Sequence, residues 1–105
     1  RAWSGPMNPA DLSAFYSSNP TIIDESLTEQ KVILKGTIDS FRERPKEGRT
    51  VVFARLTKNS LPVECAFAYP NEISRCKTGD TMTLVGTYYG PKNASLLVYN
   101  CLVLP

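Results

Sequence analysis

Basic side chains gather around one aromatic ring in a single segment of the 105-residue chain. Residues 42–58 contain six lysines and arginines against two glutamates, which gives the segment a net charge of +4, whereas the whole chain carries +2. Cationic groups attract phosphates, and a base stacked on an aromatic ring contributes about 1 to 3 kcal/mol. The segment therefore has the residue types that bind single-stranded nucleic acid. They are Arg42, Arg44, Lys46, Arg49, Phe53 and Arg55.

The same segment also has a purely structural interpretation. Phe53 can pack beneath an N-terminal helix, and the basic groups can be solvated, with Glu43 and Glu47 cancelling part of their charge. One ring is a small platform, because single-strand binders stack successive bases on several rings. We weigh this structural interpretation slightly above the binding site.

The sequence contains no histidine, which removes the usual general base at neutral pH and the most common metal ligand. Cys–His and Ser–His nucleophile pairs are excluded with it. The glycine-rich phosphate-binding motifs and C-x-x-C pairs are also absent from the sequence. We therefore predict a protein that is not an enzyme and has neither a metal site nor a cofactor.

Length and composition indicate one small globular unit. Hydrophobic residues make up 42% of the chain and charged residues 21%, unlike a disordered protein. No apolar run approaches the roughly 20 residues that a membrane span needs, so we predict no span in this chain. The opening residues show no signal-peptide pattern.

The N-terminal residues are predicted to be helical. Asn8 followed by Pro9 is typical of a helix start, and apolar side chains then recur at helical spacing over about residues 9–18. Pro20 should end this helix, because the residue before a proline avoids the α conformation. A further helical turn is expected in residues 21–30.

From Lys31 onward the pattern changes to the alternation of apolar and polar residues that is typical of β-strands. Five strands are predicted, in residues 31–41, 50–57, 63–68, 81–90 and 95–104. Gly36 and Gly86 inside strands fit the bends or bulges of a small barrel. Residues 42–49 are expected to form a loop, and residues 69–80 a segment with a short helix.

The fold class predicted from this order is all-β with short helices, in the form of a five-stranded OB-fold barrel with an N-terminal helix. We expect a helical extension over residues 1–30, packed on a barrel formed by residues 31–105. Tyr88 and Tyr89 are consecutive in a strand, so one of them should lie at the barrel surface.

Several of these segments together resemble the tRNA-anti-like OB-fold family of bacterial proteins. They are "DLSAFYSSNPTIID", "KVILKGTIDSF", "VECAF", "CKTGDTMTLVGTYYG" and "LLVYNCLVL". The resemblance implies a non-enzymatic OB-fold module that binds single-stranded nucleic acid. It also implies the bacterial periplasm or cell envelope rather than the cytoplasm, because several members are lipoproteins or envelope proteins.

OB folds bind ligands across their second and third strands and the two flanking loops. This surface takes in the basic segment and adds Lys92 from the last turn. The predicted ligand-binding residues are Arg42, Arg44, Lys46, Arg49, Phe53, Arg55 and Lys92.

A second function remains open, that of a protein-interaction or scaffold module in an envelope, secretion or transfer assembly. The weak net charge and the scarcity of expected exposed aromatic residues favour it. The acidic start of the chain, with a net charge of −3 over residues 1–30, does so too.

The three cysteines leave two structural alternatives open. In an oxidising compartment Cys65 and Cys101 would form a disulfide, since their predicted strands lie close together, with Cys76–Cys101 as the competing pair. The alternative, which we favour, is three buried thiols that pack as small hydrophobic side chains. Catalytic use of a thiol is not expected without a neighbouring base.

Overall fold

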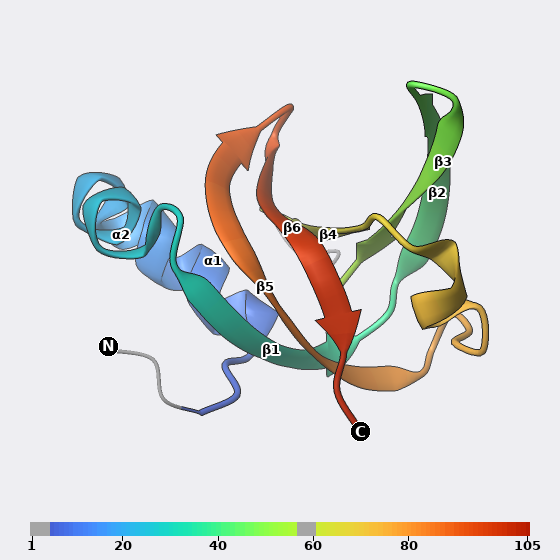
Figure 1. Ribbon diagram of the computed structural model, residues 1–105. Helices are drawn as coiled ribbons and strands as arrows, with labels where there is room; N and C mark the ends of the chain where they lie inside the picture. Colours follow the sequence, from blue (N-terminus) through green and yellow to red (C-terminus); the bar gives the residue numbers. More distant parts are fainter. Residues whose placement is uncertain (1–4, 57–60) are drawn as a thin grey trace.

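A computed structural model of the chain describes residues 5–56 and 61–105. It is mostly β, with two short helices ahead of a six-stranded open sheet (Figure 1). The elements, in chain order, are α1 (Pro9–Ser18), α2 (Pro20–Leu27), β1 (Lys31–Thr37), β2 (Ser40–Lys46), β3 (Arg49–Arg55), β4 (Val63–Phe67), the 3-10 helix η1 (Pro70–Ile73), β5 (Thr81–Lys92) and β6 (Ser95–Val103).

The two predicted helices are confirmed, and the second is longer than one turn. The side-chain oxygen of Asn8 caps α1 by accepting a hydrogen bond from the backbone N–H of Ala10, at 2.8 Å. Helix α1 packs against β1 and β4, and α2 packs against β5. Of the predicted helical extension, residues 1–4 lie outside the described part. Neither helix in the described residues is long and apolar enough to cross a membrane.

The sheet has the order β1-β5-β6-β4-β3-β2, and only β4 and β6 pair in parallel. Its two edge strands, β1 and β2, are consecutive in the chain and are separated only by Ile38 and Asp39. The N–H of Ile38 donates to the carbonyl of Asp80 at 2.9 Å, and the N–H of Asp39 donates to that of Arg55 at 2.7 Å. The chain therefore changes from pairing with β5 to pairing with β3 within two residues, and the sheet must curl.

The prediction of a five-stranded barrel is wrong in two respects. The predicted first strand is two strands, because the chain changes direction at Ile38–Asp39, and the edges β1 and β2 form no ladder, which leaves the sheet open. The predicted loop over residues 42–49 is wrong as well. The β2–β3 hairpin extends to a tight turn at Glu47 and Gly48, whose φ angles of 52° and 82° are left-handed.

The core lies inside the curl of the sheet and is closed by the helices and η1. Its largest fully buried side chains include Leu12, Leu34, Phe67, Leu84 and Tyr88. The short helix expected after the third predicted strand is present as η1, and its Ile73 is buried in the same cluster.

Gly86 is required by this core. It lies at an irregularity in the pairing of β5 with β6, as expected of a bulge glycine. A Cβ atom added there would lie 2.6 Å from Cγ1 of Val98 and 2.7 Å from Sγ of Cys101. Neither atom belongs to a flexible chain end that can move aside, because both residues are buried.

We predict that Gly86→Ala lowers the free energy of unfolding by about 1 to 3 kcal/mol, the usual effect of overpacking a core. Urea denaturation of the purified variant measures this change. Gly5→Ala is the matched control, since an added Cβ there meets nothing within 4 Å. Equal unfolding midpoints for the two variants would contradict the packing described here.

Candidate functional site

A cleft of about 340 Å³ opens on the face of the sheet opposite the core. Its walls come from the β2–β3 hairpin and the β5–β6 hairpin, and β4 and β6 contribute its floor. The two hairpins rise on either side of this space in Figure 1. Five of the predicted ligand-binding residues line the cleft, namely Arg42, Arg44, Lys46, Phe53 and Lys92.

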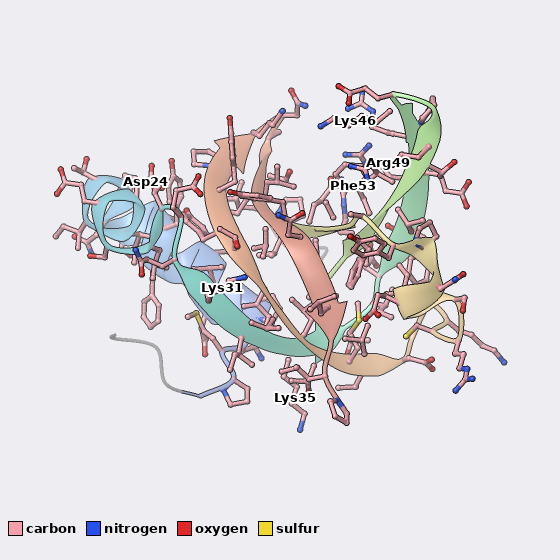
Figure 2. The ribbon with its side chains drawn as sticks, viewed as in Figure 1. Asp24, Lys31, Lys35, Lys46, Arg49 and Phe53 are labelled. Carbon is pink, nitrogen blue, oxygen red and sulfur yellow. The ribbon has the colours of Figure 1, made fainter. Side chains whose placement is uncertain are left out.

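Strand alternation places the cations of β2 on one face. Arg42, Arg44 and Lys46 are two residues apart, so their side chains point to the same side of the strand. Phe53 lies directly opposite Arg42 on β3, and Arg49 lies directly opposite Lys46. Figure 2 shows Lys46, Arg49 and Phe53 on the side of this hairpin that faces the β5–β6 hairpin.

A buried carboxylate organises the floor of the cleft. Glu64 is only 4% exposed, and each of its carboxylate oxygens binds an arginine. Arg42 Nη2 lies 2.7 Å from Oε1, and Arg55 Nη2 lies 2.8 Å from Oε2. Burial by itself raises the pKa of Glu64, but the hydrogen bonds from the two arginines outweigh it and lower the pKa overall. The carboxylate is therefore charged at neutral pH, and the cluster of three side chains carries a net charge of +1.

The same arginine covers the aromatic ring. The guanidinium carbon of Arg42 lies 4.2 Å from the centroid of the Phe53 ring, a cation–π contact. Phe53 is half-buried in the cleft. Because Glu64 and the Phe53 ring both hold the guanidinium of Arg42, the Arg42–Phe53 pair is a preformed surface for stacking.

Two of the predicted residues do not line the cleft. Arg55 is bound to Glu64 beside it, and Arg49 is exposed next to the hairpin turn. Sequence reasoning also missed Glu64 and Asn93, which do line it. A signal for Glu64 was present, since a glutamate inside an otherwise apolar strand needs a charged partner when it is buried.

The cysteines are free thiols in this structure, with Cys65 and Cys101 buried and Cys76 half-buried. Burial, followed by the neighbouring Cys101 thiol and the Glu64 charge, raises the pKa of Cys65, so its thiol is protonated at neutral pH. The Cys65–Cys101 disulfide stays a prediction. Within residues 5–56 and 61–105 no group of three metal-ligating side chains is close enough to hold a metal ion.

Residues 4–102 match the tRNA_anti-like family. Among solved structures, the chain is similar to a "putative nucleic acid-binding lipoprotein" from Klebsiella pneumoniae, with a TM-score of 0.80 and 14% identity over 95% of this chain and 92% of that one. It is also similar to part of RecG bound to a three-way DNA junction, with a TM-score of 0.55 and 18% identity over 78% of this chain and 12% of that one. No curated protein matches the chain. At these identities the structural likeness concerns the fold alone.

We predict that Glu64→Gln lowers the free energy of unfolding at pH 7 by about 1 to 2 kcal/mol. This is less than the loss of a fully buried ion pair, because both arginines are partly exposed to solvent. The pKa of Glu64 is lower in the folded state, so its charged form stabilises the fold above the ordinary carboxyl pKa. The difference between wild type and variant should shrink as the pH falls below about 4 and through the lowered pKa.

Urea denaturation at several pH values between 7 and 3 measures this difference. Glu43→Gln is the matched control, because Glu43 is exposed on the opposite face of β2. A Glu64→Gln variant that is as stable as the control at pH 7 would contradict the role of the ion pairs.

A thiol reagent should label Cys76 first in the folded protein, because Cys65 and Cys101 are no more than 1% exposed. Denaturation without a reductant then exposes the remaining thiols to the reagent. Three labelled thiols in total mean that the buried pair is reduced, and one in total means that it has formed the predicted disulfide. Rapid labelling of Cys65 in the native state would contradict the burial described.

Proposed function

Because the chain belongs to the tRNA_anti-like family, we propose that it is a non-enzymatic binding module of the OB type whose ligand is single-stranded nucleic acid. One observation carries this proposal. Cations from both hairpins surround a single cleft, and one of its walls carries the Arg42–Phe53 pair. Two observations support the OB type. The sheet is curled, with its first two strands, β1 and β2, at opposite edges, and the likeness to the Klebsiella pneumoniae lipoprotein extends over most of both chains.

The charges of the cleft are divided between its rim and its floor. Arg44, Lys46 and Lys92 line it and form no ion pair with any described residue. They are available to phosphates, and they come from the two hairpins that face each other across the opening. On the floor, Glu64 offsets one of its two arginine charges, so the attraction for an anion is weaker there than at the rim. The arrangement favours a ligand with its phosphates at the rim and its base inside the cleft, against the Arg42–Phe53 pair.

The dimensions of the cleft suit this chemistry. A volume of about 340 Å³ lies at the small end of the range for ligand sites, about 300 to 1,000 Å³, and holds one base with its sugar rather than a folded partner. Asn93, in the turn between β5 and β6, adds a side-chain amide at the opening. The proposed location is the bacterial envelope, and its support is that the similar Klebsiella pneumoniae protein is described as a lipoprotein.

Two variants separate the contributions of phosphate and base. Replacing both Arg44 and Lys46 with alanine should weaken binding of a fluorescent oligothymidylate at least tenfold at low salt. It should also flatten the plot of log affinity against log salt by about 0.7 for each phosphate that the variant no longer neutralises. Phe53→Leu should weaken binding about tenfold while leaving the salt slope unchanged, because it removes stacking and no charge. Fluorescence anisotropy at several salt concentrations measures both effects.

Lys35→Ala is the matched control for charge, since Lys35 is exposed on β1, away from Lys46 in Figure 2. If Lys35→Ala weakens binding as much as a cleft variant, the attraction is diffuse and the site is wrong. If the wild type binds no oligonucleotide at low salt, nucleic-acid binding is ruled out as the function. The protein-interaction or scaffold function would then be the remaining candidate.

A further inference from the structure

Two tyrosines, one exposed and one half-buried, form an aromatic pair beside the cleft. The rings of Tyr89 on β5 and Tyr99 on β6 meet edge to face, with centroids 6.3 Å apart and an angle of 79° between their planes. Tyr88 is fully buried while Tyr89 is 46% exposed, which confirms that the two consecutive tyrosines point to opposite faces. A large aromatic side chain that is half exposed on a sheet face is a candidate for ligand contact.

Glu29, in the chain segment between α2 and β1, holds the tyrosine pair in place. The hydroxyl of Tyr99 donates a hydrogen bond to Oε1 of Glu29 at 2.7 Å, and the backbone N–H of Glu29 donates to the carbonyl of Tyr88 at 2.9 Å. The hydrogen bond to Glu29 raises the pKa of Tyr99, so the hydroxyl keeps its proton. Tyr99 therefore acts as a fixed support whose ring positions Tyr89.

The pair is continuous with the cleft. Leu97 lines the cleft, and Tyr99 follows it by two residues on β6, so both side chains lie on the same face of the sheet. Lys92 also lines the cleft, and its Nζ lies 5.6 Å from the centroid of the Tyr89 ring. This distance is close to the limit of about 6 Å for a cation–π contact, so the ammonium group is only weakly held there.

We propose that Tyr89, supported by Tyr99, is a second base-stacking platform of the same binding face, and that the ligand is a strand long enough to contact Phe53 and Tyr89 together. The inference rests on the function proposed above. Strands β3 and β5 are separated by β4 and β6, which amounts to about 14 Å along the sheet. One nucleotide does not span that length. Lys92, which lies on β5 beside Tyr89 and also lines the cleft, is placed to bind a phosphate of the same strand.

The side chains of this binding face favour a single strand of nucleic acid over other ligands. An isolated anion gains only from the cations, and an apolar peptide gains only from the rings. A single strand presents both bases and phosphates, and this face presents groups for both: the rings of Phe53 and Tyr89, and the cation of Lys92, which lines the cleft and lies beside Tyr89. Such a combination of stacking groups and a basic surface is the way in which single strands are bound without base-specific contacts.

The test uses Tyr89→Leu in the full chain with oligothymidylates of two and twelve nucleotides, measured by fluorescence anisotropy. Binding of the twelve-nucleotide strand should weaken about tenfold, as expected when one base no longer stacks, whereas binding of the dinucleotide should not change. Tyr89→Phe keeps the ring and should bind both ligands as the wild type does. Tyr69→Leu is the matched control, because Tyr69 is 64% exposed and does not line the cleft.

The outcomes separate this inference from the proposed function. If Phe53→Leu weakens binding of the long strand and Tyr89→Leu does not, the second platform is wrong while the nucleic-acid function stands. If Tyr69→Leu weakens binding as much as Tyr89→Leu, no particular ring is used and the platform is again wrong. If the wild type binds neither ligand, the proposed function fails and the inference fails with it. Thermal unfolding of each variant confirms that it is folded before binding is compared.

Discussion

The two-residue link between β1 and β2 is the constraint on which the site depends. Ile38 is 1% exposed, its N–H binds the carbonyl of Asp80, and its carbonyl accepts from the N–H of Gly79. The N–H of Asp39 donates to the carbonyl of Arg55. Since opposite edges of the sheet are joined by so short a connection, the sheet cannot lie flat. The link also fixes where β2 begins and hence the position of the β2–β3 hairpin, which forms one wall of the cleft, while the β5–β6 hairpin forms the other.

Glu64 couples this geometry to charge. A carboxylate buried in the sheet without partners would be strongly destabilising, so its two arginines are needed by the fold before they serve any ligand. Arg42 thereby has two roles, since it pairs with Glu64 and makes a cation–π contact with Phe53. The cations without such a structural role are those at the rim. Arg55 thus serves stability, the rim cations are available for binding, and Arg42 contributes to both.

The sequence was most informative where structure is local. The cap at Asn8 and the alternation of buried strands predicted helices and sheet correctly, because both signals depend on neighbouring residues. Strand β2 was mistaken for a loop because most of its side chains are exposed on both faces, so no apolar alternation marks it. Only its pairing with β3 makes it a strand. The basic residues of β2 and β3 were found from their charge and Lys92 from the expected OB-fold surface, whereas Glu64 was missed because its partners lie on other strands.

The fold alone does not specify the ligand, since the same curled sheet can present many different side chains on its open face. In this chain the identity of the ligand depends on a few positions at which the alternation of side chains along the strands places aromatic rings and cations on the same face of the sheet. A ligand that carried only charge would leave Phe53 and Tyr89 unused, and a purely apolar ligand would leave Arg44, Lys46 and Lys92 unused. A flexible strand that offers both groups in turn uses all of them. Its affinity should therefore depend on salt and on aromatic contacts independently, which a surface built for simple electrostatic attraction would not show.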